Sequence, residues 1–100
     1  MKLRTITAPD GKPITFQLVP FPKIAQGVIW GATADLGREY RVSIDSTRPP
    51  KMQREALGHE LAHVFLGHFD RPKGTDPEEI ENEANAHAAR YLWRYRLRLL

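Results

Sequence analysis

The stretch "LGHELAHVFLGH", residues 57–68, decides how this chain folds, because it places three of the four histidines in one short segment. Within it, His59, Glu60 and His63 form the string His-Glu-x-x-His. Residues four apart on a helix project from the same face, so the two imidazoles would lie one turn apart. The apolar residues around them predict a helix over about 50–67 that is packed into the protein.

Apolar residues occupy two sides of this predicted helix. One side carries Met52, Ala56 and Leu66 beside the histidines, and the opposite side carries Leu57, Leu61, Val64 and Phe65. Unpartnered polar groups cost on the order of a few kcal/mol when they are buried. Zn²⁺ would satisfy both imidazoles at once, with Glu60 beside a metal-activated water. The alternative is that all three are solvated side chains, and the apolar flanks disfavour it.

A catalytic zinc has three protein ligands and one open position, so a third ligand is required. A second helix is predicted over about 77–98, with an apolar stripe of Ile80, Ala84, Ala88, Tyr91 and Leu92. Glu81 falls in this stripe, where burial would require a cation, and it is the predicted third ligand. Glu83 lies on the other side of the helix. It is the alternative ligand, or else a solvated residue paired with His87.

Two further polar residues lie near the predicted ligands. Asn85, one turn after Glu81, has the reach to hydrogen-bond a ligand histidine and fix its ring, although an ordinary amide at the core edge is the alternative. His68 follows Gly67, which would end the first helix. It could join the ligand face only if the chain bent back. We therefore expect His68 to contact the free carbonyls of the helix end.

The first half of the chain predicts strands. They are "LRTIT" (3–7), "ITFQLV" (14–19), "GVIWGATADLG" (27–37) and "YRVSID" (40–45). Turns at 9–11 and 36–38 would join neighbouring strands, and such short loops favour antiparallel pairing. The predicted fold class is α+β: a small antiparallel, possibly mixed, sheet of three to four strands, mostly a meander, followed by the two helices. All 100 residues would form a single minimal domain.

Turn and capping residues predict where both helices begin. The segment "STRPP" (46–50) supplies Ser46, Thr47 or a proline for the first turn of the first helix. Asp76 and Pro77 supply an N-cap and a first residue for the second helix.

The composition limits the classes of partner. The chain has no cysteine and no apolar run long enough to cross a membrane or to act as a leader, so a cytoplasmic protein is expected. The net charge of +3 depends on arginines close to the C-terminus, namely Arg90, Arg94, Arg96 and Arg98. Nucleic-acid binding would rest on these arginines alone, and the helix dipole already accounts for them.

The C-terminal segment "YLWRYRLRLL" (91–100) is more apolar than a solvated helix end requires. Its large apolar residues are Leu92, Trp93, Leu97, Leu99 and Leu100. They would either close the domain's own core or contact a partner or a second copy of the chain.

"HELAHVFLGH" followed by "ENEANAHAA" resembles the ImmA/IrrE-like zinc metallopeptidases of the gluzincin group, over about residues 40–92. The resemblance implies that His59, His63 and Glu81 bind zinc and that Glu60 is the general base. It also implies that an edge strand near 40–45 borders the cleft and pairs with an extended peptide. The family commonly continues with Leu-Leu-Met-Pro. This chain has no proline there, so its last helix should run on.

The predicted function is therefore zinc-dependent endopeptidase hydrolysis of a peptide or protein substrate. Glu60 would take the proton of the metal-activated water and pass it to the leaving amine. Tyr40, Tyr91, Tyr95 and His68 are the candidates for stabilising the oxyanion. The alternative is a non-catalytic or regulatory zinc-binding module that contacts another protein.

Overall fold

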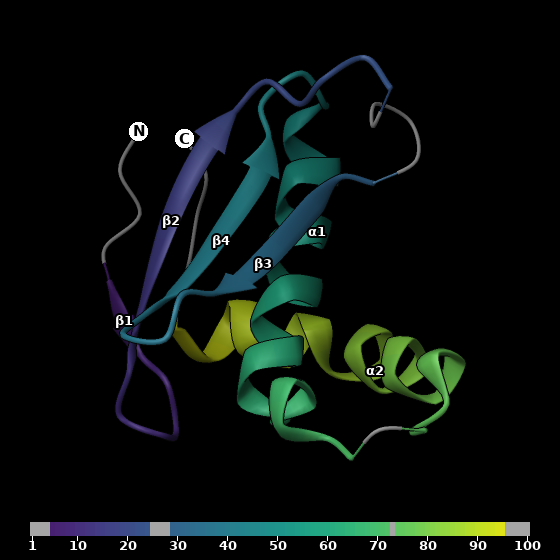
Figure 1. The fold of residues 1–100 in the computed structure, drawn as a ribbon. Helices are drawn as coiled ribbons and strands as arrows, with labels where there is room; N and C mark the ends of the chain where they lie inside the picture. Colours follow the sequence, from purple (N-terminus) through teal and green to yellow (C-terminus); the bar gives the residue numbers. More distant parts are fainter. Residues whose placement is uncertain (1–4, 25–28, 73, 96–100) are drawn as a thin grey trace.

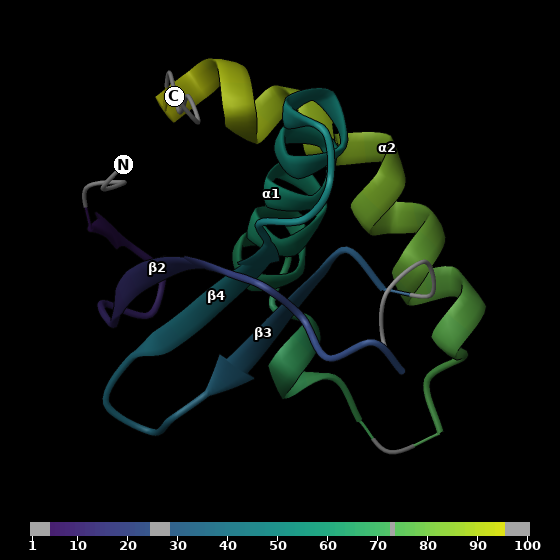
Figure 2. The same cartoon turned by 90° about the horizontal axis from the view of Figure 1, so that it is seen from above.

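A computed structural model describes residues 5–24, 29–72 and 74–95 of the chain. Four strands come first: β1 (Ile6–Thr7), β2 (Pro13–Val19), β3 (Gly31–Asp35) and β4 (Tyr40–Asp45). Helix α1 (Pro50–Phe65), the short 3₁₀ helix η1 (His68–Asp70) and helix α2 (Pro77–Tyr95) follow. Figures 1 and 2 show α1 against one face of the sheet and α2 crossing α1 on its other side. The predicted α+β class is confirmed.

The sheet is mixed, with strand order β1-β2-β4-β3. The hairpins β1–β2 and β3–β4 are antiparallel, as their turns predict, but β2 runs parallel to β4. The predicted meander is wrong at this pairing, since β4 lies between β2 and β3 (Figure 1). The central position suits β4, because its helix-facing residues are the most apolar: Tyr40, Val42 and Ile44 are at most 3% exposed.

The edge strand beside α1 is β3, not β4. The expectation of an edge strand near 40–45 is therefore wrong, because β4 has a hydrogen-bonded neighbour on each side. The free edge of the sheet at this end belongs to Gly31–Asp35.

Helix α1 is buried almost all round between residues 56 and 64, as a helix between a sheet and another helix must be. It begins with Pro50 after Pro49, and the buried amide of Gln53 donates to the carbonyls of Ser46 and Arg48. Gly67, with φ 69°, lies just past its end in the left-handed region that glycine tolerates. The predicted exit at Gly67 is confirmed.

The entry to α1 is organised by Asp45, whose side chain is fully buried. Its carboxylate accepts hydrogen bonds from the backbone of Phe21 and from Thr47, and it pairs with Arg48 at 3.3 Å. Burial alone would raise the pKa of Asp45, but the hydrogen bonds from Thr47, Phe21 and Arg48 outweigh it and lower the pKa to about 2.

We expect Asp45→Asn to lower the free energy of unfolding at pH 7, because its amide cannot replace an acceptor-only carboxylate. Since the folded pKa is depressed, the carboxylate stabilises the protein above its unfolded pKa, and this contribution is lost as the pH falls towards 2. Urea unfolding at pH 7 and pH 3 measures both effects. An Asp45→Asn variant whose stability falls with acid as steeply as that of wild type would contradict this account.

The two helices approach closely at Gly58. A Cβ atom there would lie 2.7 Å from the carbonyl oxygen of Ala88 and 3.0 Å from Leu92, so only glycine fits. Ala84, on the same side of α2, is fully buried. This contact fixes how near α2 comes to the histidines of α1.

Helix α2 begins as predicted: the Asp76 carboxylate accepts a hydrogen bond from the backbone of Glu78, and Pro77 is the first residue. Towards its end, Leu92 packs on the core, while Trp93 is 86% exposed. The predicted continuation to residue 98 lies outside the described residues. Neither of the described α-helices is both long enough and apolar enough to cross a membrane.

Candidate metal centre

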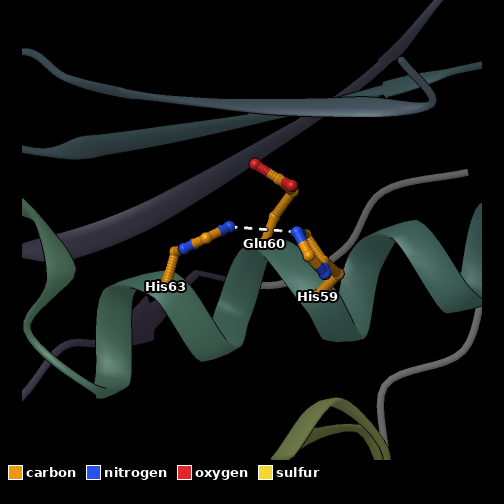
Figure 3. Close-up of side chains that lie close together, drawn as sticks. All are labelled: His59, Glu60 and His63. Carbon is orange, nitrogen blue, oxygen red and sulfur yellow. Dashed lines mark hydrogen bonds between the residues drawn. The ribbon is translucent and has the colours of Figure 1, made fainter. Parts of the chain in front are cut away.

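His59 and His63 face one another from the same side of α1, as Figure 3 shows. Their Nε2 atoms are 3.0 Å apart. Glu81 of α2 approaches both: its carboxylate oxygens lie 2.8 Å from His59 Nε2 and 3.2 Å from His63 Nε2. The structure thus brings together the three residues that the sequence predicts as metal ligands.

A hydrogen bond to Asn85 orients the ring of His59. Its Nδ1 lies 2.8 Å from Oδ1 of Asn85, and an amide oxygen can only accept. A hydrogen bond from Nδ1–H of His59 to this oxygen leaves Nε2, which faces Glu81, as the nitrogen that can bind a metal ion.

The spacing of the donor atoms also fits zinc. Zinc holds nitrogen and oxygen ligands at about 2.0–2.2 Å, so donors at two tetrahedral corners lie about 3.4 Å apart. The distances of 2.8–3.2 Å among His59, His63 and Glu81 are slightly shorter than this. Burial lowers the pKa of His63, which keeps its imidazole neutral and able to ligate.

Glu60 is the other carboxylate beside the histidines. His59, Glu60 and His63 each offer a ligand atom within 4.8 Å of the others. Glu81 is the better ligand, because both its oxygens already lie within 3.2 Å of an imidazole nitrogen. The carboxylate of Glu60 instead points towards the strands (Figure 3), where the Thr33 hydroxyl donates to it at 3.0 Å.

The environment of Glu60 suits proton transfer. The residue is 8% exposed, and this burial raises its pKa above the usual value, although the Thr33 hydrogen bond and the nearby His59 oppose the shift. A carboxylate with a raised pKa is a better base at neutral pH. Its burial and its link to β3 hold it beside the imidazoles.

Two expectations about α2 are corrected. Glu81 was expected to be buried, but its side chain is 55% exposed and reaches the histidines from the rim. Glu83, the alternative ligand, contacts neither Nε2 atom; it pairs with His68 at 2.8 Å and with Arg71 at 2.7 Å. The hydrogen bonds from His68 and Arg71 lower the pKa of Glu83.

His68 is the site residue whose role the sequence missed. Its Nδ1 lies 2.8 Å from His63 Nδ1, so the expectation that it contacts helix carbonyls is wrong. The left-handed Gly67 turns the chain back beneath α1 and carries His68 there. The signal in the sequence was the position of His68 directly after Gly67, the glycine that ends the helix.

Three of the four predicted oxyanion donors are hydrogen-bonded or stacked with other residues. The Tyr40 hydroxyl donates to Asp10 at 2.5 Å, and the Tyr91 ring stacks on Phe65 with centroids 5.0 Å apart. Both ring nitrogens of His68 are engaged with other side chains. The side chain of Tyr95 lies outside the described residues.

A cleft of about 540 Å³ opens over the histidines, between the start of β3, α1 and α2. Its wall includes Trp30, Gly31 and Ala56. A Cβ atom on Gly31 would lie 3.1 Å from Cγ of Glu60 and 3.2 Å from Ile44. Glycine at this position lets β3 pass directly over Glu60.

If Glu60 is the general base that the sequence predicts, we expect Gly31→Ala to displace it by a few tenths of an ångström and to lower the kcat of the predicted peptide hydrolysis roughly tenfold, because small misplacements of a reacting group are costly. Zinc binding should stay unchanged, since the histidines do not contact the new methyl group. Steady-state peptide hydrolysis and zinc titration measure the two effects, with Ala32→Ser on the opposite face of β3 as control. If Gly31→Ala kept the wild-type kcat, the expected effect of displacing Glu60 on the rate would be wrong.

The family model described as the IrrE N-terminal-like domain (Peptidase_M78) matches residues 18–97. The match spans β3, β4, α1, η1 and α2. It confirms the resemblance that the two helix motifs indicate. No curated protein and no solved structure matches the chain at a significant level.

Proposed function

Because this chain belongs to the IrrE N-terminal-like domain family of peptidases, we propose that it is a zinc-dependent metalloendopeptidase of the gluzincin type. In this proposal His59, His63 and Glu81 hold the zinc ion, and Glu60 is the general base. The cytoplasmic location is part of the proposal, and a chain without cysteine is compatible with a reducing compartment.

One observation carries the proposal. One donor atom from each of His59, His63 and Glu81 converges on the same space: Nε2 of His59 lies 2.8 Å from a carboxylate oxygen of Glu81 and 3.0 Å from Nε2 of His63. Two imidazoles with one carboxylate are a ligand set that suits Zn²⁺.

Zinc held there would polarise the scissile carbonyl and lower the pKa of a water molecule to about 7. Glu60, buried and held by Thr33, accepts a proton from the attacking water. It then gives this proton to the leaving amine, which is the exchange that a general base with a raised pKa performs well.

The free edge of β3 supports an extended peptide as substrate. Trp30 and Asp45 form a hydrogen-bonded pair, and antiparallel pairs alternate along the ladder. The backbone groups of Gly31, Thr33 and Asp35 therefore point away from β4, on the side where no further strand pairs with β3 among the described residues. An internal segment of a peptide could add as a strand there, which favours endopeptidase action.

We expect wild-type protein to hydrolyse quenched fluorescent peptides and to lose this activity completely when 1,10-phenanthroline removes the metal. One equivalent of Zn²⁺ should restore it, whereas Mg²⁺, which prefers oxygen ligands, should not. The measurement is the rate of fluorescence increase before and after metal removal. Hydrolysis that is insensitive to the chelator would exclude a zinc peptidase.

The alternative function is a non-catalytic zinc-binding module that contacts another protein or a second copy of itself. The observation in its favour is Trp93, which is 86% exposed on α2. Sedimentation over a range of protein concentrations distinguishes self-association from a monomeric enzyme.

A further inference from the structure

A line of hydrogen-bonded side chains extends behind His63, away from the cleft. His63 Nδ1 lies 2.8 Å from His68 Nδ1, and His68 Nε2 lies 2.8 Å from Oε2 of Glu83. The same oxygen of Glu83 accepts a hydrogen bond from Arg71 at 2.7 Å. The four residues come from α1, η1, the loop after it and α2.

His68 is the most buried imidazole of this group. Its side chain is 3% exposed, against 12% for His63 and 21% for His59. Burying an imidazole this deeply is costly unless both ring nitrogens have partners, and here both do. An imidazole as deeply buried as that of His68 indicates a structural or functional role for this residue.

The partners of His68 indicate which of its nitrogens donates. The carboxylate of Glu83, which also accepts from Arg71, can only accept, so His68 donates from Nε2. Nδ1 of His68 is then the nitrogen placed to accept a hydrogen bond from Nδ1–H of His63. The Nε2 lone pair of His63 is left facing His59 and Glu81.

We propose that His68 and Glu83 are positioning residues of the metal centre, which hold His63 in the tautomer that presents Nε2 to the metal. Asn85 does the same for His59 with a neutral amide. The relay to His63 ends in the Glu83 carboxylate, so two successive hydrogen bonds hold the ring of that ligand in place. The inference rests on the zinc site of the proposed function and adds the residues that orient it.

The relay links the metal to the packing of η1. His68 reaches His63 only because the chain reverses at Gly67, and Glu83 reaches His68 only when α2 is docked on α1. Zinc affinity should therefore depend on residues that do not line the cleft.

The test measures zinc affinity by competition with a chromophoric chelator in full-length protein. His68→Leu keeps much of the volume but removes both hydrogen bonds, and it should weaken zinc binding 10- to 100-fold, as loss of such partners typically does. His68→Gln can accept from His63 and donate to Glu83, so it should recover most of the affinity. Glu79→Gln, an exposed change on α2, is the control and should bind as wild type.

A second readout follows the proton itself. Long-range ¹H–¹⁵N NMR of the metal-free protein should show His63 as the Nδ1–H tautomer in wild type and in His68→Gln, and a mixture of tautomers in Glu83→Gln. If His68 had only a structural role, these substitutions would leave the tautomer of His63 unchanged. If His68→Leu fails to fold, the tautomer of His63 in wild type and in Glu83→Gln still decides the matter.

The outcomes separate this inference from the function on which it rests. Zinc binding by wild type with unchanged affinity in folded His68→Leu would overturn the relay and leave the metal site intact. An Nε2–H tautomer of His63 in the wild-type protein would overturn it as well. Absence of zinc binding in wild type would remove both the proposed function and the relay.

Discussion

Glu60→Gln should lower kcat/KM for peptide hydrolysis by about 10²–10⁴-fold, the usual contribution of a general base. The substitution keeps the size of the side chain and an oxygen that can accept the hydrogen bond from Thr33. Glutamine cannot take a proton from water at neutral pH, so only the chemical step should suffer. Initial rates over a range of peptide concentrations measure the effect.

Two measurements make this result specific to proton transfer. The zinc content and melting temperature of Glu60→Gln should match those of wild type, because the imidazoles and Glu81 are unchanged. Thr33→Val, which removes the hydrogen bond but keeps the base, should lose much less activity than Glu60→Gln. Full activity in Glu60→Gln would exclude this residue as the base and favour the non-catalytic alternative.

Glu81→Ala should weaken zinc binding by more than about 100-fold, because a direct ligand contributes more than the partners behind it. Among the residues that the structure describes, only Glu81 places a carboxylate within 3.2 Å of the Nε2 atoms of His59 and His63. A ligand that binds only the folded state stabilises it, so zinc at 100 times the wild-type Kd should add about 2.7 kcal/mol to wild type. At the same concentration, a 100-fold weaker variant gains only about 0.4 kcal/mol.

Thermal unfolding with and without zinc, together with metal analysis, measures this loss. Glu79→Ala is the matched control, since it makes the same change on an exposed residue of the same helix. The comparison also tests the alternative ligand. If Glu83→Ala removed zinc completely while Glu81→Ala bound it normally, Glu83 would have to replace Glu81 as the ligand.

The sequence by itself determined the features that depend on one helix. The spacing of His59 and His63 places both imidazoles on one side of α1 without reference to the rest of the fold. Gly67 and Asp76 marked where α1 ends and α2 begins, because left-handed backbone and helix capping are local properties. The order of the two motifs was enough to indicate the family, which the match over residues 18–97 confirms.

Relations between elements were predicted less well. Periodicity placed Glu81 in a buried stripe, yet its side chain is 55% exposed, although Ala84 and Tyr91 of the same stripe are buried. Short loops suggested a meander, but the longer link between β2 and β3 let β4 take the central position.

Only the tertiary structure decided that His68 and Glu83 act together. They are fifteen residues apart in sequence, and they meet because a reversal at Gly67 and the crossing of α2 over α1 bring their side chains within 2.8 Å. Local propensities define each helix and its faces. The angle and distance between helices are set by packing among residues remote in the chain, and a metal centre built from two helices depends on both.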